Sequence, residues 1–176
     1  RIKALPEQPD FVYVSSYMPD LALIIRTLRE SGINVPVVGG DAYDDPAFFE
    51  SLGEEYGSDI YFDTHGYLSD EGHPGYSDFL AAYKEKFGSE PDALWVLPGY
   101  DVVMVLAQAM EEAGTTDGAE VAKAMESMTF DCLTGELDWA DAAGGHEPNK
   151  AAAVVKLDKG VPSFIGWRTP EFLPAP

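Results

Sequence analysis

The chain has 176 residues, 45% of them hydrophobic and 12% aromatic, which supplies a core for one or two compact modules and excludes a disordered chain. Eleven Lys and Arg against 31 Asp and Glu give a formal net charge of -20. A field of this sign repels phosphate backbones and anionic membrane surfaces, so nucleic acid is excluded as a partner, and solubility explains the acidic residues better than metal binding does.

The compartment is left open by the sequence. Cys132 is the single cysteine, so no internal disulfide can form, which fits both a reducing cytoplasm and an exported protein without disulfides. No apolar run approaches the roughly 20 residues that span a bilayer. Arg1 opens a polar stretch without the apolar core of a signal peptide, and a chain without an initiating Met is compatible with a leader that has been removed.

Predicted strands and helices alternate over the first 64 residues. β-Branched and aromatic runs predict strands at 11–14, 35–38 and 60–62. The helix after the first strand has Pro19 in its first position, Asp20 at the positive end of its dipole and Gly32 as its stop signal. A strand, a loop and a helix therefore follow one another, and the order then repeats.

The spacing of these elements predicts a parallel sheet. A second, short helix is predicted over residues 46–52, with Asp44 or Asp45 as its cap. The alternative interpretation of these two acids is that they are solvated charges near the end of the helix. Strands that alternate with helices in this way form right-handed crossovers, so the predicted fold class is α/β with a parallel sheet flanked by helices. Ligands of such sheets bind outside the carboxyl ends of the strands, which points to the loops that carry Tyr17 and Asp41.

Beyond residue 64 the pattern changes to helices. Residues 65–75 are polar and rich in Gly, Asp and His, which is typical of a linker or crossing segment. Helical periodicity predicts one helix from Phe79 that ends at Gly88, a second around residues 102–110 that ends at Gly114, and a shorter third over 117–128. Strands are predicted at 134–139, 151–157 and 161–167, and Asp158-Lys159-Gly160 joins the last two in a hairpin.

Motifs for catalysis, metals and nucleotides are weak. His65 and His73, with acidic residues between 63 and 71, do not match the spacing of a recognised zinc or calcium site. Cys132 leads into a strand, where a small buried hydrophobe is the ordinary explanation. Gly39-Gly40 lacks the further glycines of a dinucleotide loop and the lysine of a P-loop. We therefore expect no cofactor and no metal.

Three stretches of the chain carry a family resemblance. They are PDFVYVSSYMPDLALIIRTLRESGINVPVVGGD at residues 9–41, FLAAYKEKFGSEPDALWVLPGYDVVMVLAQAMEEAG at 79–114 and FDCLTGELDWAD at 130–141. Together, in this order, they resemble the leucine/isoleucine/valine-binding proteins and their amide-binding relatives, which are substrate-binding proteins of ABC transporters. The resemblance implies a type I periplasmic-binding-protein fold, in which two α/β lobes joined by three hinge strands close on a ligand.

The resemblance also implies which part of that fold is present. It places residues 1–64 and 150–176 in the second lobe, with a C-terminal strand hairpin, and residues 65–149 in a helical portion of the first lobe with the hinge crossings. The crossings are expected near His65 and between Trp139 and Ala151. Since members of the family are much longer, we expect the opening half of the first lobe, and half of the binding site, to be absent.

Four residues are implied as ligand contacts. Asp41 takes the place of the acid that accepts from an amino acid's ammonium group, and its alternative is a turn or cap residue. Tyr17 takes the place of a cleft tyrosine that stacks on the ligand, and its alternative is a core aromatic. Tyr100 would approach from the other lobe, and Tyr43 lies where many relatives carry an aromatic; helix packing and a solvated loop are their alternatives.

The resemblance implies a receptor and not an enzyme. The expected protein is the solute-binding component of an ABC importer. A branched-chain aliphatic amino acid is favoured as its ligand, bound in a cleft between the lobes. Amides, urea and aromatic acids are alternative ligands, and a sensory receptor domain is an alternative role for the same fold. An enzyme that uses Asp41 as a base would need a phosphate loop or a nucleophile-base pair, and the sequence shows neither.

The expected partners are a small-molecule ligand and the permease subunits of the membrane. The expected location is extracytoplasmic, in the periplasm or as a cell-surface lipoprotein. Taken alone, the chain is expected to bind its ligand poorly, because the donors for a ligand carboxylate would be absent. A homodimer that covers the surface normally buried by the absent half is a further expectation.

Overall fold

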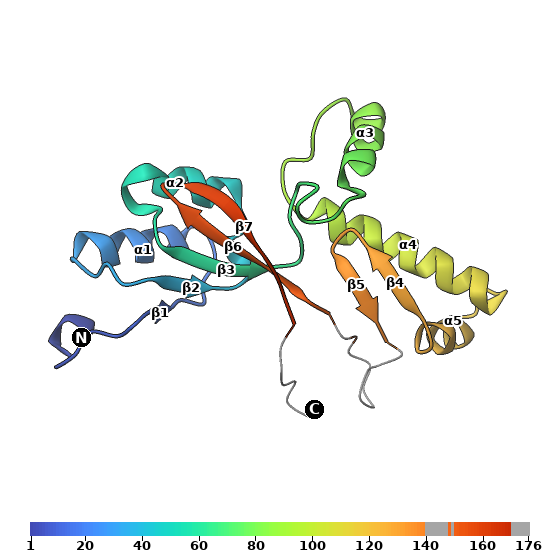
Figure 1. The fold of residues 1–176 in the computed structure, drawn as a ribbon, viewed down its shortest axis with the longest axis horizontal. Coiled ribbons are helices and arrows are strands. Elements are labelled where there is room, and N and C mark those ends of the chain that lie inside the picture. Colours follow the sequence, from blue (N-terminus) through green and yellow to red (C-terminus); the bar gives the residue numbers. More distant parts are fainter. Residues whose placement is uncertain (140–147, 149, 170–176) are drawn as a thin grey trace. The chain divides into compact units, whose positions relative to one another are not determined.

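The computed structural model describes residues 1–139, 148 and 150–169, and these form two compact units (Figure 1). Unit 1 comprises Arg1–Thr64 and Ala153–Gly166, and unit 2 comprises His65–Ala152 and Trp167–Pro176. The chain therefore passes between the units at the junctions 64–65, 152–153 and 166–167. The assignment of these parts to a first and a second lobe stays a prediction, and most of the segment in which the return crossing was expected lies outside the described residues.

Unit 1 is built on a five-stranded sheet in the order β1-β2-β3-β6-β7. The strands are β1 (Val12–Tyr13), β2 (Val37–Gly39), β3 (Ile60–Thr64), β6 (Ala152–Asp158) and β7 (Val161–Arg168). The first three pair in parallel, and β6 pairs antiparallel with β3. Lys159 and Gly160 both have positive φ in the tight turn between β6 and β7, which is the backbone geometry of a two-residue hairpin.

Two helices cover one face of this sheet. α1 (Asp20–Glu30) and α2 (Pro46–Tyr56) pack against each other above β1, β2 and β3 (Figure 1). Alternate side chains of β3 and β6 are buried, as expected for strands with one covered face. Asp45 caps α2, since its carboxylate accepts a hydrogen bond from the Ala47 amide at 2.8 Å. Short 3-10 helices, η1 (Ile2–Ala4) and η2 (Asp41–Tyr43), complete unit 1.

Unit 2 is mainly helical. It contains α3 (Tyr76–Phe87), α4 (Val96–Ala113), α5 (Gly118–Met125) and an antiparallel pair of strands, β4 (Thr129–Cys132) and β5 (Gly135–Asp138). α4 lies beside α5 and β4 (Figure 1). Among the described residues of unit 2, buried hydrophobic side chains form separate small clusters, one of Val105, Ala109, Val121, Phe130 and Cys132 and one of Leu94, Leu97 and Leu133.

Most predicted elements are confirmed, with boundaries that differ by a few residues. Gly88 and Gly114 follow α3 and α4 in the left-handed conformation, with φ of 79° and 64°, as the stop signals predicted. Asp117 caps α5 by accepting hydrogen bonds from two backbone amides. The α/β fold class with a parallel sheet and a C-terminal hairpin is therefore confirmed.

Three details of the prediction were wrong. Pro19 is the residue before α1 and not its first helical residue. α2 continues past Leu52 to Tyr56, because the chain resumes helical geometry after a kink at Gly53, where φ is 54°. β4 was not predicted as a strand. Its alternate residues Phe130 and Cys132 are buried, but an alternation over only four residues is a short signal.

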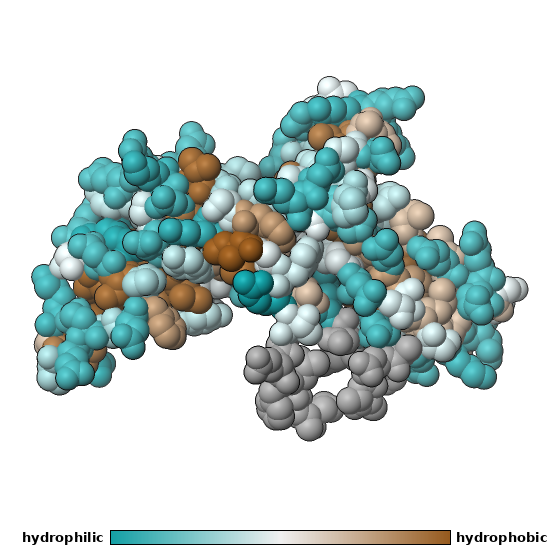
Figure 2. Space-filling model, in the orientation of Figure 1, coloured by the Kyte–Doolittle hydropathy of each residue, from teal (hydrophilic) through white to brown (hydrophobic). Residues whose placement is uncertain are grey.

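The surface agrees with the acidic composition. Figure 2 shows hydrophilic side chains over most of the visible face, interrupted by hydrophobic patches. In the described part of the chain, no helix combines the length and the apolar character that crossing a membrane requires.

Candidate ligand-binding site

Two loops leave the same edge of the unit 1 sheet. β1 and β2 are parallel neighbours, and the Val14 amide donates to the Val38 carbonyl oxygen at 3.0 Å, so their carboxyl ends lie side by side. Tyr17 lies in the loop after β1, and Asp41 lies in the turn after β2. This carboxyl edge is where parallel α/β sheets bind ligands, so the structure brings these two predicted residues to the expected edge.

Asp41 begins η2, directly after the extended residue Gly40. Two backbone hydrogen bonds close this turn, from the Tyr43 amide to the Gly40 carbonyl at 3.1 Å and from the Asp44 amide to the Asp41 carbonyl at 3.0 Å. The Asp41 residue is half-buried. A carboxylate on such a closed turn is well suited to accept from an ammonium group, because little backbone freedom remains to be lost. Asp41 is thus a turn residue, and its ligand role stays a prediction.

Tyr17 is an exposed aromatic at the same edge. It is 76% exposed, so the alternative of a core aromatic before the helix is wrong. Its carbonyl oxygen accepts from the Leu21 amide at 2.8 Å, which ties the loop to the first turn of α1. The backbone is therefore anchored while the ring remains accessible for stacking. Contact with a ligand stays a prediction.

Tyr43 lies inside unit 1. It is 0% exposed, and its hydroxyl donates to the Val14 carbonyl oxygen at 2.7 Å. The ring meets Phe48 edge-on with centroids 5.1 Å apart, and burial raises the pKa of the hydroxyl. The solvated-loop interpretation is therefore wrong, and the predicted ligand contact is corrected to a supporting role, because the buried side chain offers a solute no surface here.

Gly39 makes room for this tyrosine. A Cβ atom on Gly39 would lie 2.1 Å from Cζ of Tyr43, far inside van der Waals contact. From the sequence, Gly39-Gly40 was compared only with nucleotide-binding loops, and this packing role was not predicted. The available signal was a glycine at the end of a strand, which often marks the close approach of another group.

The third strand also contributes to this edge. Thr64, at the end of β3, is 2% exposed and donates its hydroxyl to Oδ2 of Asp44 at 2.8 Å. Asp44 is half-buried, so its interpretation as a solvated charge is wrong. This bond joins the end of β3 to the segment after η2, and all three parallel strands thus support the turn that carries Asp41.

Tyr100 belongs to unit 2. It lies in α4, and its ring meets Phe79 of α3 in a T-shaped contact with centroids 5.2 Å apart, which confirms helix packing. The residue is 44% exposed and borders a cavity of about 350 Å³ that His73, Met104 and Asp131 also line. A ligand contact from its exposed part stays a prediction.

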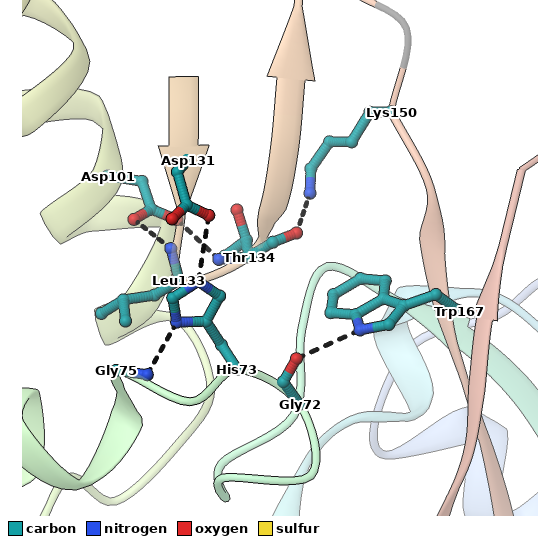
Figure 3. A network of polar contacts seen from close by, with 9 residues as sticks. All are labelled: Gly72, His73, Gly75, Asp101, Asp131, Leu133, Thr134, Lys150 and Trp167. Carbon is teal, nitrogen blue, oxygen red and sulfur yellow. Dashed lines mark hydrogen bonds and ion pairs between the residues drawn. The ribbon is translucent and has the colours of Figure 1, made fainter. Parts of the chain in front are cut away.

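Asp101 is a buried acid that sequence analysis missed. It is 4% exposed on α4, and its carboxylate accepts from the backbone amides of Leu133 and Thr134, both at 2.9 Å (Figure 3). These bonds hold the turn between β4 and β5 against α4. A signal was present, because Asp101 is the one charged residue in the apolar run 96–110.

The other groups considered for chemistry have local partners. His73 Nδ1 accepts from the Gly75 amide at 3.0 Å, so Nε2 carries the proton and donates to Asp131 Oδ1 at 3.1 Å. Among residues 1–139, 148 and 150–169, no group of three or more His, Cys, Asp or Glu is placed to hold a metal ion. Cys132 is 4% exposed, as predicted, and burial raises the pKa of its thiol to about 11, so the thiol is protonated at neutral pH.

A parallel sheet with an acid and an exposed aromatic at its carboxyl edge is typical of α/β proteins that bind small molecules there. The class is narrowed by comparison of the whole chain with known families. Residues 1–162 match the periplasmic binding protein family, and the chain belongs to that family.

Individual relatives agree with this assignment. The chain is 28% identical over 127 residues to the leucine-, isoleucine-, valine-, threonine- and alanine-binding protein of Pseudomonas aeruginosa, which covers 72% of this chain and 33% of the relative. It is 30% identical over 150 residues to Leu/Ile/Val-binding protein homolog 1 of Brucella abortus, covering 85% and 38%. The crystal structure of the leucine-binding protein LivK from Thermotoga maritima superimposes with a TM-score of 0.75 at 30% identity, covering 93% of this chain and 45% of LivK. The chain thus spans less than half the length of these relatives.

Proposed function

We propose that this chain is part of the solute-binding component of an ABC importer and that its ligand is a branched-chain aliphatic amino acid. Family membership supports the receptor class, and the names of the Pseudomonas, Brucella and Thermotoga proteins support the ligand. The observation that carries the proposal is the position of Asp41, a half-buried acid on a closed turn at the carboxyl edge of the sheet.

The chemistry of this edge fits part of an amino acid. Asp41 accepts from the ligand ammonium group, and Tyr17 offers an aromatic face to the ligand side chain. Tyr43 and Gly39 support the turn that carries Asp41. The Tyr43 hydroxyl donates to the Val14 carbonyl oxygen, and its ring packs closely against Gly39. These residues supply no cationic donor for the ligand carboxylate, so the chain alone should bind weakly.

Calorimetric titration tests the proposal. The protein to use is a chimera in which this chain replaces the matching 45% of LivK, so that all parts of the family fold are present. Leucine, isoleucine, valine, phenylalanine and a short amide are titrated into the chimera, and leucine-type ligands are expected to bind most tightly. Asp41→Asn is expected to weaken binding by roughly 30-fold or more, because one partner of a desolvated charge pair is lost.

Two controls sharpen the result. Asp10→Asn neutralises an exposed acid just before β1, at the opposite end of that strand, and should leave the affinity unchanged. The 176-residue chain alone, titrated in parallel, should show no submicromolar binding. Affinity unchanged by Asp41→Asn in a folded chimera would show that the ligand ammonium is held elsewhere.

The proposal extends to partners and location. A receptor of this family delivers its ligand to permease subunits of the membrane, and it does so outside the cytoplasm. The net charge of -20 on each chain opposes pairing of two copies, so the predicted homodimer would need high salt to form. Sedimentation of the chain at low and high salt measures this directly.

A further inference from the structure

At each of the three junctions, the residues on the unit 2 side lie near one lysine, Lys150. The chain enters or leaves unit 2 at His65, at Ala152 and at Trp167. Lys150 lies two residues before the second of these. Its ammonium group donates to the carbonyl oxygen of Thr134 (Figure 3) and lies 5.8 Å from the centroid of the Trp167 ring. It also donates to the carbonyl oxygen of His65 at 3.5 Å. One side chain therefore contacts the first and third junctions while its backbone belongs to the second.

The ring that faces this ammonium group is itself anchored. The Trp167 indole nitrogen donates to the Gly72 carbonyl oxygen at 3.1 Å (Figure 3). A Cβ on Gly135 would lie 3.4 Å from the ring, and Gly135 has a φ of 94°, so the glycine both permits the turn and lets the indole approach. The end of β7 is thus tied to the loop of residues 65–75 and to the start of β5.

The carbonyl group that accepts from Lys150 is also held in place. Asp101 accepts from the Thr134 amide at 2.9 Å, so the same residue binds a buried carboxylate through its amide and an ammonium group through its carbonyl. His73 ties Asp131 of β4 to Gly75 by bonds of 3.1 and 3.0 Å. The contacts of Lys150 therefore end on groups that α4 and the 72–75 segment already fix.

The burial of Lys150 differs from that of the other cationic residues of unit 2. The other lysines and arginines of unit 2, at 84, 86, 123 and 168, are exposed, whereas Lys150 is half-buried. Burial lowers the pKa of Lys150, and the negative charge of Asp101 opposes that effect. Desolvating an ammonium group costs free energy, which the contacts with Thr134, His65, Trp167 and the charge of Asp101 offset.

We propose that Lys150 is a positioning residue that locks the unit 2 ends of the three junctions into one body. Any change in the placement of the two units then occurs at the junctions themselves and leaves unit 2 unchanged. Gly166, immediately before Trp167, has a φ of 140°, a conformation that side chains rarely adopt, so backbone freedom begins directly beyond the lock. The proposal is independent of which solute the protein binds.

Hydrogen exchange measured by NMR on the 176-residue chain tests this assignment without a ligand. Lys150→Met keeps most of the apolar stem and removes the charge and the donors. The Thr134 amide and the Trp167 indole N–H are expected to exchange at least about tenfold faster in this variant. Lys150→Arg, which retains charge, donors and stacking on the indole, is expected to restore slow exchange. Lys123→Met, at an exposed lysine of α5, is the matched control and should change nothing.

Amides elsewhere distinguish a lock from general stabilisation. In Lys150→Met, exchange at Val105 of α4 and at Val38 of β2 should stay as in the parent chain. Unchanged exchange at Thr134 and Trp167, or equal acceleration throughout unit 2, would overturn the proposal, as would failure of Lys150→Arg to restore protection. If Lys150→Met does not fold, Lys150→Gln takes its place, since it removes the charge and shortens the side chain. Faster exchange at the Thr134 amide and the Trp167 indole N–H is again expected, and no change at either group overturns the lock.

Discussion

Unit 1 and unit 2 are held together by different kinds of contact. In unit 1 an apolar layer lies between the sheet and its two helices. Ten of its buried residues are at most 1% exposed: Leu21, Ile25, Val37, Tyr43, Phe48, Ile60, Phe62, Ala153, Val155 and Leu157. In the described part of unit 2 the buried hydrophobic residues form separate small clusters, and α3 contains no buried residue. The polar contacts of Asp101, His73 and Lys150 join its segments. A sheet with two helices makes its own core, whereas unit 2 depends on a few directional bonds.

Helix α1 of unit 1 and helix α4 of unit 2 differ in how much of their apolar surface is buried. α1 buries Leu21, Ala22 and Ile25 on one face and exposes charged residues such as Arg26 and Glu30. α4 is apolar around most of its circumference, yet only Leu97, Asp101, Val105 and Ala109 of its 18 residues are buried. Val102 and Val103, for example, are 59% and 64% exposed. A helix of this composition is typical of a position in which neighbouring segments cover several of its sides. The described residues of this chain cover only one side of α4.

The largest expected effect contrasts a buried phenylalanine of unit 1 with an exposed phenylalanine of unit 2. Phe62→Ala, in β3 of unit 1, removes a ring that is 1% exposed and should destabilise the chain by about 3–5 kcal/mol. Phe87→Ala, at the end of α3 in unit 2, removes a ring that is 60% exposed and should cost less than about 1 kcal/mol. Urea unfolding followed by circular dichroism measures both. Similar costs would mean that α3 is packed far more tightly than its exposure indicates.

A pair of glycines makes the next comparison. Gly39→Ala places a methyl group 2.1 Å from the Tyr43 ring and should destabilise unit 1 by about 3 kcal/mol, because a buried ring with a bonded hydroxyl cannot move aside freely. Gly99→Ala, in α4 of unit 2, meets no atom within 4 Å and should stabilise by about 0.5–1 kcal/mol. Thermal unfolding of the two variants distinguishes these signs. A neutral Gly39→Ala would show that the turn carrying Asp41 relaxes easily.

The polar character of unit 2 predicts a smaller effect. Asp101→Asn leaves one carbonyl oxygen where two carboxylate oxygens accept from Leu133 and Thr134, so one buried amide loses its partner at a cost of about 1–2 kcal/mol. Asp92→Asn, at an exposed acid before α4, is the control and should be silent. Hydrogen exchange at the Leu133 and Thr134 amides reports the loss locally, and protection equal to that of the parent chain would contradict the assigned bonds.

A final effect is a pH dependence confined to unit 2, which is absent at neutral pH. Burial, aided by the charge of Asp101, raises the pKa of the Cys132 thiol from 9.0 to about 11. The unfolded chain loses this proton at lower pH than the folded chain, so this contribution to stability is complete below pH 9 and is lost as the pH rises through about 11. Cys132→Ala removes the dependence. The stability difference between parent and variant should therefore shift in favour of Cys132→Ala from about pH 8 to about pH 10.5, and a constant difference would contradict the raised pKa.

Local signals in the sequence predicted much of the fold. Gly88 and Gly114 end their helices, Asp117 caps α5, and the Asp158–Gly160 turn forms the predicted hairpin, because each depends on the conformation of a few consecutive residues. The short pair β4 and β5 was predicted only in part. Its pairing depends on residues outside each strand, which periodicity within a strand does not report.

The sequence predicted the sheet edge at which the candidate site lies, but it did not predict the contacts of the side chains there. Tyr17 and Asp41 lie at the carboxyl edge as the βαβ order required. Tyr43 was placed at that edge too, but its side chain turns inward, because Gly39 leaves space and Val14 offers an acceptor. Neither the space at Gly39 nor the acceptor at Val14 can be recognised from the sequence, because both meet Tyr43 only once β1 and β2 lie side by side.

By itself, the sequence determined the order of strands and helices, the parallel start of the sheet, the burial of Cys132 and membership of the periplasmic binding protein family. These follow from periodicity, turn residues and composition, which act over short stretches. Only the tertiary structure decided that Tyr43 supports the turn, that Asp101 is buried, and that Lys150 contacts three other segments, at His65, Thr134 and Trp167. Each of these depends on atoms far apart in the chain, and a hydrogen bond or a close contact exists only when folding brings its two ends within reach.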